Sequence, residues 1–165
     1  MEQISEDLAL RAWRAMLRAQ RRVSRALDVE LSQRGGLPLR AYEVLSRLAR
    51  APGCAMRMSD LASSVLLSAS GITRLVDQLA DRGLIERRAD PADARATVAV
   101  LTREGKSILR KTGGIYSEGV KKHFAAHLAE PELLAIAESL ERLLAPVEQR
   151  PAPRDRRQRP GKEAP

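Results

Sequence analysis

The chain has few aromatic residues, a single cysteine and no long apolar run, and each shortage excludes a class of protein. The aromatic content is 2%, which argues against a single-strand nucleic-acid binder, because such proteins stack bases on aromatic side chains. Cys54 is the sole cysteine among 165 residues, so neither an intrachain disulfide nor a multi-cysteine zinc site can form. The apolar runs are far shorter than the roughly 20 residues of a membrane span, and the first thirty residues show no signal-peptide pattern. We therefore expect a cytoplasmic protein.

Positive charge, by contrast, is in excess. The formal net charge is +8 at pH 7 and the pI is about 10.5, which suggests a polyanionic partner, either nucleic acid or an anionic membrane. The excess is uneven, with +4 in residues 1–50, zero in residues 51–105, +1 in residues 106–145 and +3 in residues 146–165. The last of these segments contains five of the nine prolines. We expect it to be a disordered basic tail.

Long helical patterns lie at both ends of the remaining chain. Within residues 7–33, the side chains of one face recur at intervals of three and four residues, which predicts one helix with a continuous seam. Residues 103–145 predict two more helices, and Gly113 and Gly114 interrupt the first of them, where we expect a kink or a tight contact. Helices of this length exceed the needs of one small core, so a dimer seam would explain them. The first seam consists of Leu10, Trp13, Leu17, Gln20, Ser24, Leu27 and Leu31.

The middle of the chain has the pattern of a helix-turn-helix. A short helix is expected over residues 39–50, with a loop at residues 51–55. Ser59 suits the N-cap of the next helix, and Ser68 suits the N-cap of a further helix over residues 69–82. Two short helices joined by a tight turn are typical of helix-turn-helix units.

A β-hairpin is expected directly behind that pair of helices. Gly83 predicts a left-handed C-cap, and residues 84–88 and 97–101 read as two short strands around a polar loop. Thr102 then suits the N-cap of the following helix. A hairpin behind the second helix is the arrangement of a winged helix.

A specific motif covers this hairpin and the residues that follow it. It reads Asp-x-Arg, a strand, and then Leu-Thr-x-x-Gly, and it is formed by Asp93, Arg95, Leu101, Thr102 and Gly105. The runs Thr-Arg-Leu-Val-Asp-x-Leu and Arg-Gly-Leu-Ile stand upstream with matching spacing. With these motifs the chain resembles the MarR family of bacterial transcription regulators, over about residues 7–145.

The resemblance implies a mainly α fold with a small β-hairpin wing. Residues 1–145 would form one MarR-type domain, with a winged helix-turn-helix lobe at about 39–101 and dimerisation helices at about 7–33 and 103–145 that intertwine with those of a second subunit. It also implies a homodimer that binds a palindromic operator on double-stranded DNA. A small molecule would release such a repressor by shifting the spacing of its two lobes.

Candidate DNA contacts lie on the second helix of the pair and on the wing. Ser68, Ser70, Thr73 and Arg74 fall opposite the apolar face of their helix, and their hydroxyl and guanidinium groups can bond phosphates or base edges. The resemblance places Arg95 in the minor groove.

The remaining wing residues have supporting roles. The resemblance gives Asp93 a structural role, in which it holds the wing by pairing with an arginine. Arg87 and Arg88 alternate along a strand, so only one of them is expected to contact a phosphate. We assign that contact to Arg88.

A small phenolic or carboxylate effector is the second partner that the resemblance implies. Trp13, Arg14, Arg18 and Tyr42 could line its pocket, because arginines and aromatic walls suit such ligands. The alternative is that Trp13 and Tyr42 belong to the dimer core and that both arginines lie on the surface.

Other chemistry finds little support. His123 and His127 are spaced to share a helix face, but a zinc site would need a third ligand, so we predict no metal and no cofactor. Cys54 lies near Arg50 and Arg57 in sequence, which could make it a redox sensor. No catalytic motif is present, so we predict that the protein is not an enzyme. A dimeric ligand- or protein-binding adaptor without sequence-specific DNA binding is the alternative to a DNA-binding regulator.

Overall fold

The computed structural model describes residues 6–65, 69–90 and 93–145. The chain divides into two compact units, Met1–Ala126 and His127–Pro165, which are described separately. The expected basic tail and the candidate N-cap Ser68 lie outside the described residues. No helix among the described residues has both the length and the apolar character that a membrane crossing requires.

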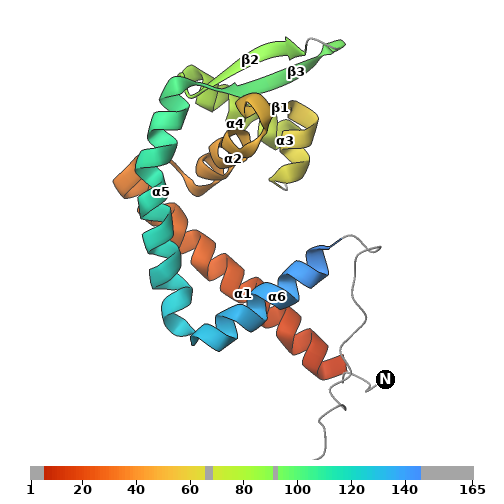
Figure 1. Cartoon of the computed structure of the whole chain (residues 1–165), viewed down its shortest axis with the longest axis vertical. Coiled ribbons are helices and arrows are strands. Elements are labelled where there is room, and N and C mark those ends of the chain that lie inside the picture. Colours follow the sequence, from red (N-terminus) through yellow and green to blue (C-terminus); the bar gives the residue numbers. More distant parts are fainter. Residues whose placement is uncertain (1–5, 66–68, 91–92, 146–165) are drawn as a thin grey trace, which may run out of the picture. The chain divides into compact units, whose positions relative to one another are not determined.

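The described residues are mainly helical, with one small sheet (Figure 1). The helices α2 and α4 and the long helices near both ends agree with the sequence prediction. In chain order the elements are α1 (Glu6–Glu30), the π-turn η1 (Leu31–Gly35), α2 (Leu39–Arg50), the 3-10 turn η2 (Pro52–Cys54), β1 (Ala55–Arg57), α3 (Met58–Ser64), α4 (Ala69–Asp81), β2 (Ile85–Asp90), β3 (Asp93–Leu101), α5 (Arg103–His123), the 3-10 turn η3 (Ala125–His127) and α6 (Glu130–Leu144).

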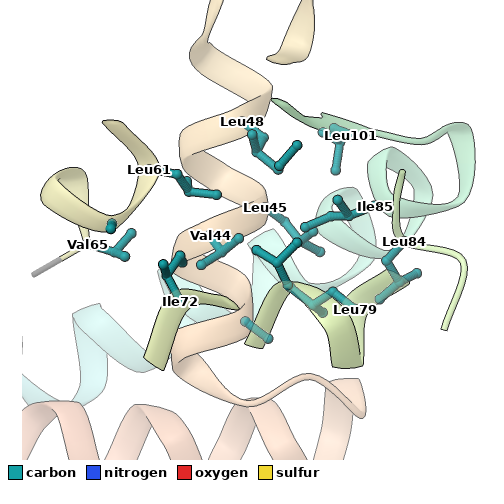
Figure 2. Close-up of a cluster of buried hydrophobic side chains, with 14 of the residues drawn as sticks. Val44, Leu45, Leu48, Leu61, Val65, Ile72, Leu79, Leu84, Ile85 and Leu101 are labelled. Carbon is teal, nitrogen blue, oxygen red and sulfur yellow. The ribbon is translucent and has the colours of Figure 1, made fainter. Parts of the chain in front are cut away.

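The core of the helix-turn-helix lobe is built around α2. Val44, Leu45 and Leu48 are fully buried, because their spacing of one, three and four residues places them on one helix face. Figure 2 shows these side chains packed with those of α3, α4 and the sheet. Leu61 and Ile72 supply the helical side of that core. The lobe is therefore held together by aliphatic packing, which fixes where α4 and the wing lie.

The sheet has three antiparallel strands in the order β1-β3-β2. The loop expected at residues 51–55 is partly wrong, since β1 begins at Ala55 and pairs with β3 through Ala55 and Val100. A strand of three residues is too short to show an alternating pattern. The wing strands are also longer than expected, because only residues 91–92 separate β2 from β3. Figure 1 shows this hairpin extending past the helices of the lobe, where both of its faces meet solvent and no apolar alternation is needed.

The expected helix caps have mixed outcomes. Ser59 is not an N-cap, because α3 already begins at Met58 and its N-cap is Arg57. Gly83 does end α4 in the left-handed region, with φ of 69°. Its N–H donates to Ala80 O at 2.8 Å and the Leu84 N–H donates to Leu79 O at 2.9 Å, which closes the helix and turns the chain into β2.

The glycines of α5 differ from the prediction. The helix runs without interruption from Arg103 to His123, and a Cβ on Gly113 or Gly114 would meet nothing within 4 Å. The close approach lies one and a half turns further on, where a Cβ on Gly119 would be 2.6 Å from Leu27 Cδ2. Gly119 therefore lets α1 and α5 pack closely, whereas Gly113 and Gly114 have no such role.

Glu30 joins α1 to the end of α5. Its Oε1 accepts a hydrogen bond from Lys122 Nζ at 2.8 Å and lies 2.8 Å from His123 Nε2, and its side chain is 16% exposed. The hydrogen bonds from Lys122 and His123 lower the pKa of Glu30 to about 2. The carboxylate is therefore favoured by the folded state.

This lowered pKa predicts a pH dependence of stability. Because the folded pKa lies below the unfolded value near 4.5, the contribution is complete above about pH 4.5 and is lost as the pH falls toward 2. Urea unfolding of the chain and of Glu30→Gln, at pH values from 6 down to 2.5, should show a difference in unfolding free energy that shrinks below pH 4.5. A difference that stays constant over this range would contradict the assignment.

The two end helices expose large apolar side chains. On α1, Leu10, Trp13 and Leu17 are 42%, 53% and 37% exposed, although Leu27 and Leu31 of the same seam are buried. On α6, the corresponding exposed residues include Leu134, Leu140 and Leu144. Apolar patches of this kind on a monomer typically mark interaction surfaces.

Candidate nucleic-acid interface

The helix α4 has one buried face and one polar face. Ile72, Val76 and Leu79 point into the core and are at most 1% exposed. Because a helix repeats every 3.6 residues, the opposite face gathers side chains three, four, seven and eight positions apart. They line an open hollow of about 620 Å³ and are Ser70, Thr73, Arg74, Asp77, Gln78 and Asp81. The structure thus brings together three of the predicted contacts, Ser70, Thr73 and Arg74.

A second hollow lies between α4 and the wing. Its volume is about 340 Å³, and Arg57, Arg87 and Arg95 contribute guanidinium groups to it. Thr73 lines this hollow as well as the first. The helix face and the wing therefore form one continuous polar surface with several cations, which is the kind of surface that nucleic-acid backbones require.

Arg57 forms an ion pair with the last residue of β2, next to the turn of the wing. Its Nε lies 2.5 Å from Asp90 Oδ2, and the Asp90 side chain is only 8% exposed. The Asp90 carboxylate raises the pKa of Arg57. Because Arg57 directly precedes α3 and Asp90 ends β2, the pair holds the wing against the start of the helix-turn-helix.

The structural role that we expected of Asp93 is fulfilled differently. Asp93 Oδ1 accepts a hydrogen bond from the Arg95 backbone N–H at 3.0 Å, and the arginine ion pair of the wing is made by Asp90. A short aspartate side chain that bonds to the backbone two residues ahead is a common turn device. Arg95 thus has its backbone anchored while its side chain is exposed.

The two arginines of β2 have different surroundings. Arg88 Nη2 donates to Glu86 Oε2 at 2.7 Å, and this contact lowers the pKa of Glu86. Arg87 Nη1 instead donates to Asp77 Oδ1 of α4 and lines the hollow with Arg95. The strand alternation predicted from sequence therefore orients Arg87, and not Arg88, toward the polar face of α4.

Two arginines of the surface have no carboxylate partner. Within the part of the chain that the structure describes, no carboxylate forms an ion pair with Arg74 or Arg95. Both side chains are exposed. Their positive charge is therefore available to an anionic ligand.

Of the four residues predicted for an effector pocket, Tyr42 lines a hollow that the other three do not line. Tyr42 stacks on Tyr116, with ring centroids 4.6 Å apart and planes at 22°, and burial raises the pKa of Tyr42. The hollow beside these rings has a volume of about 340 Å³. Trp13, Arg14 and Arg18 are not among its lining residues, which also include Gln20, Arg40, Glu43, Ser46, Arg47, Arg50, Ser64 and Val65.

The histidines and the cysteine also differ from expectation. The helix α5 ends at His123, and His127 belongs to the separate turn η3, so the two do not share a helix face. Among the described residues no group of three or more ligating side chains could hold a metal ion. Cys54 is half-buried and has a φ of 56°. The cations that line the hollow beside it are Arg103, Lys106 and Arg110.

Similar proteins of known structure or sequence include bacterial transcription regulators. The MarR family model matches residues 35–96. AbsC from Streptomyces coelicolor, a MarR family transcriptional regulator, is similar with a TM-score of 0.74 and 29% identity, over 87% of this chain and 96% of that chain. The HTH-type transcriptional regulator YdgJ from Bacillus subtilis is 27% identical over 69% of this chain and 68% of that protein. The chain is thus similar to MarR family regulators in sequence and in fold.

A further similar MarR family regulator was solved with DNA. Sco3205 from Streptomyces coelicolor was solved in complex with DNA, and it is similar to this chain with a TM-score of 0.75 and 27% identity, over 90% of this chain and 97% of that chain. The sequence prediction of a mainly α winged-helix fold is confirmed. The similar proteins are transcription regulators, which supports the prediction that this chain is a transcription regulator.

The MarR motif Leu-Thr-x-x-Gly has a structural explanation here. Thr102 Oγ1 donates to Gly83 O at 2.7 Å and accepts from the Gly105 N–H at 3.0 Å. It therefore caps α5 and ties it to the turn behind α4. Gly105 leaves room for the Leu84 carbonyl, which would lie 2.2 Å from a Cβ at this position. The motif thus fixes the wing between α4 and α5.

Sequence reasoning missed several residues of this surface. Asp77 and Gln78 continue the helical spacing of Thr73 and Arg74, so periodicity alone could have found them. Arg57 comes from another element and enters the surface only through the tertiary fold, and no local pattern in the sequence indicates its position. Strand alternation singled out one of Arg87 and Arg88, but the sequence prediction chose Arg88 and the structure places Arg87 on this surface.

Proposed function

We propose that this transcription regulator binds double-stranded DNA in the bacterial cytoplasm, with the polar face of α4 in the major groove and the wing in the adjacent minor groove. The observation that carries the proposal is the continuous surface on which Thr73 joins the α4 hollow to the wing hollow. Arg74 and Arg95 lie on it without carboxylate partners among the described residues. The similar regulator Sco3205 was solved in complex with DNA, which supports DNA as the ligand.

The proposal includes a homodimer. Exposed apolar side chains on α1 and on α6 supply the surface that a second copy would cover. With residues 1–145 as one domain, the terminal helices would form the dimer and the lobe at about 39–101 would bind DNA. Twofold symmetry then calls for a palindromic operator whose half-sites are roughly 34 Å apart. Mass measurement of the purified chain in solution tests this part.

A small anionic aromatic effector is the further ligand that the proposal includes. The Tyr42–Tyr116 stack provides an aromatic wall, and Arg47 and Arg50 provide positive charge to the same hollow. Such a pocket suits a phenol or a benzoate. Millimolar benzoate should release the bound operator, and the Arg47→Gln variant should no longer show this release. Both results together would support a ligand-responsive repressor. Unchanged operator binding in its presence would count against this ligand class.

Arg74 tests how α4 binds DNA. If its guanidinium reads guanine, Arg74→Ala should cost about 1–3 kcal/mol on the operator and relax the preference at one base pair. Arg74→Lys keeps the charge but lacks the bidentate fork, so it should keep non-specific affinity and lose that preference. Fluorescence anisotropy on operator and scrambled duplexes measures both. An equal loss on all sequences would instead make Arg74 a phosphate contact.

A further inference from the structure

Asp77 is an acidic residue in the middle of a surface proposed to face DNA. It lies one turn behind Thr73 and Arg74 on the same face of α4 and lines the same hollow. Its side chain is 49% exposed, and the arginine that it contacts, Arg87, is 37% exposed. The pair is therefore open to a ligand rather than enclosed in the core.

The Asp77–Arg87 contact determines how the carboxylate is presented. Arg87 Nη1 of β2 donates to Asp77 Oδ1, so one oxygen of the carboxylate is held by the wing. The second oxygen, Oδ2, is not used by this bond. An ion pair between the strand and the helix orients the carboxylate and partly neutralises it.

A carboxylate in the major groove is selective because most groups exposed there, the phosphates and the acceptor atoms of the bases, repel a negative charge. The phosphates are negative, and guanine presents two acceptors while adenine presents an acceptor beside its amino group. Cytosine presents an N4 amino donor, which Asp and Glu accept. At a position with neither cytosine nor adenine the carboxylate has no donor, and at adenine the N7 acceptor beside the amino group repels it, so its desolvation is not fully compensated.

We propose that Asp77, held by Arg87, is a specificity-determining residue that accepts the amino group of one cytosine in each half-site and disfavours all other duplexes. This inference rests on the proposed DNA-binding function. It assigns to Arg87 a positioning role in place of the phosphate contact that a surface arginine would otherwise suggest.

The chain offers a matched control one helical turn away. Asp81 lines the same hollow, but no ion pair joins it to an arginine among the described residues. It contributes the same charge without an oriented carboxylate. Asp81→Asn therefore measures the general relief of phosphate repulsion, and any additional effect of Asp77→Asn measures base recognition.

The test is selection of duplexes from a random pool by the full-length chain and by Asp77→Asn, Asp81→Asn and Arg87→Ala, after circular dichroism has shown that each variant is folded. Affinities for the selected and for scrambled duplexes are then measured at one salt concentration. We expect Asp77→Asn to lose at least about fivefold discrimination for one cytosine, with adenine as the replacement that an asparagine would favour, and to bind scrambled DNA more tightly. Asp81→Asn should keep the original motif.

Arg87→Ala separates base recognition from a merely structural pair. It should weaken the same cytosine preference, but it should lower the affinity for scrambled DNA because a cation is lost. Opposite shifts in non-specific affinity for Asp77→Asn and Arg87→Ala support the inference. If Asp77→Asn selects the same motif and changes affinity only as Asp81→Asn does, the inference is wrong. If the unsubstituted chain selects no motif at all, the DNA-binding proposal itself fails.

Discussion

Replacing Arg95 by alanine should weaken operator binding by several-fold or more while the proposed homodimer stays intact. Arg95 lies near the start of β3, its backbone N–H is anchored by Asp93, and its exposed side chain has no carboxylate partner among the described residues. A narrow minor groove concentrates negative potential and attracts such a guanidinium. The loss should be larger on the operator than on scrambled DNA.

Arg88→Ala is the matched control for this experiment. Arg88 belongs to the same hairpin, and its replacement by alanine removes the same charge. Its guanidinium, however, is paired with Glu86 at 2.7 Å. We expect a smaller effect on operator affinity, since part of its charge is already neutralised. Electrophoretic mobility shift at a fixed salt concentration compares the two variants, and the solution mass of each shows whether the dimer persists. Equal affinity of Arg95→Ala and the unsubstituted chain would make the assignment of the wing tip wrong.

Gly105→Ala should destabilise the fold strongly. A Cβ at this position would lie 2.2 Å from Leu84 O and 2.6 Å from Leu101 Cδ1. The carbonyl belongs to the backbone and accepts a hydrogen bond from the Thr102 N–H at 3.2 Å, so it cannot move without opening the junction of α4, the wing and α5. Overpacking of this kind costs about 1–3 kcal/mol or more. Urea unfolding at a fixed protein concentration measures the loss.

Gly113→Ala is the control in the same helix. A Cβ on Gly113 would meet nothing within 4 Å, and alanine is favoured over glycine in a helix interior by about 1 kcal/mol. This variant should therefore be slightly more stable than the unsubstituted chain. Similar unfolding midpoints for Gly105→Ala and Gly113→Ala would show that the close approach at Gly105 is not what the motif glycine provides.

The helices could be predicted because their apolar residues recur with helical spacing and their ends carry recognisable caps. Val44, Leu45 and Leu48 give α2 such a face, and Thr102 marks the start of α5. The strand β1 could not be predicted, because three residues show no alternation and their pairing with β3 depends on residues more than forty positions away. The extent of the wing was underestimated for a related reason. A hairpin solvated on both faces lacks the apolar pattern that identifies a strand.

The candidate interface could be predicted only where one element supplies it. Thr73 and Arg74 follow from the spacing on α4, and Arg95 follows from the family motif. Arg57 joins them through an ion pair with Asp90, thirty-three positions along the chain, which no local pattern reveals. We expected Asp93, the aspartate of the motif, to pair with an arginine and hold the wing. The sequence could not show which of two nearby aspartates faces the arginine.

The distribution of charge has a clear structural reason. Residues 51–105 have no net charge, although the proposed DNA surface lies within them. Their acids pair with particular arginines, as Asp90 does with Arg57 and Asp77 with Arg87. This pairing leaves Arg74 and Arg95 without carboxylate partners among the described residues. Position rather than net charge therefore supports DNA binding, and the overall excess of +8 is a weaker indication.

In the proposed complex, the α4 face and the wing of each subunit of a homodimer bind one half of a specific duplex. Selection of bound duplexes from a random pool by the full-length chain tests this binding. We expect enrichment of an inverted repeat whose two halves are about one helical turn apart. The enriched duplex should bind at least roughly a thousandfold more tightly than scrambled DNA. Recovery of no common motif, with equal affinity for all duplexes, would contradict it and would favour a dimeric adaptor without sequence-specific DNA binding.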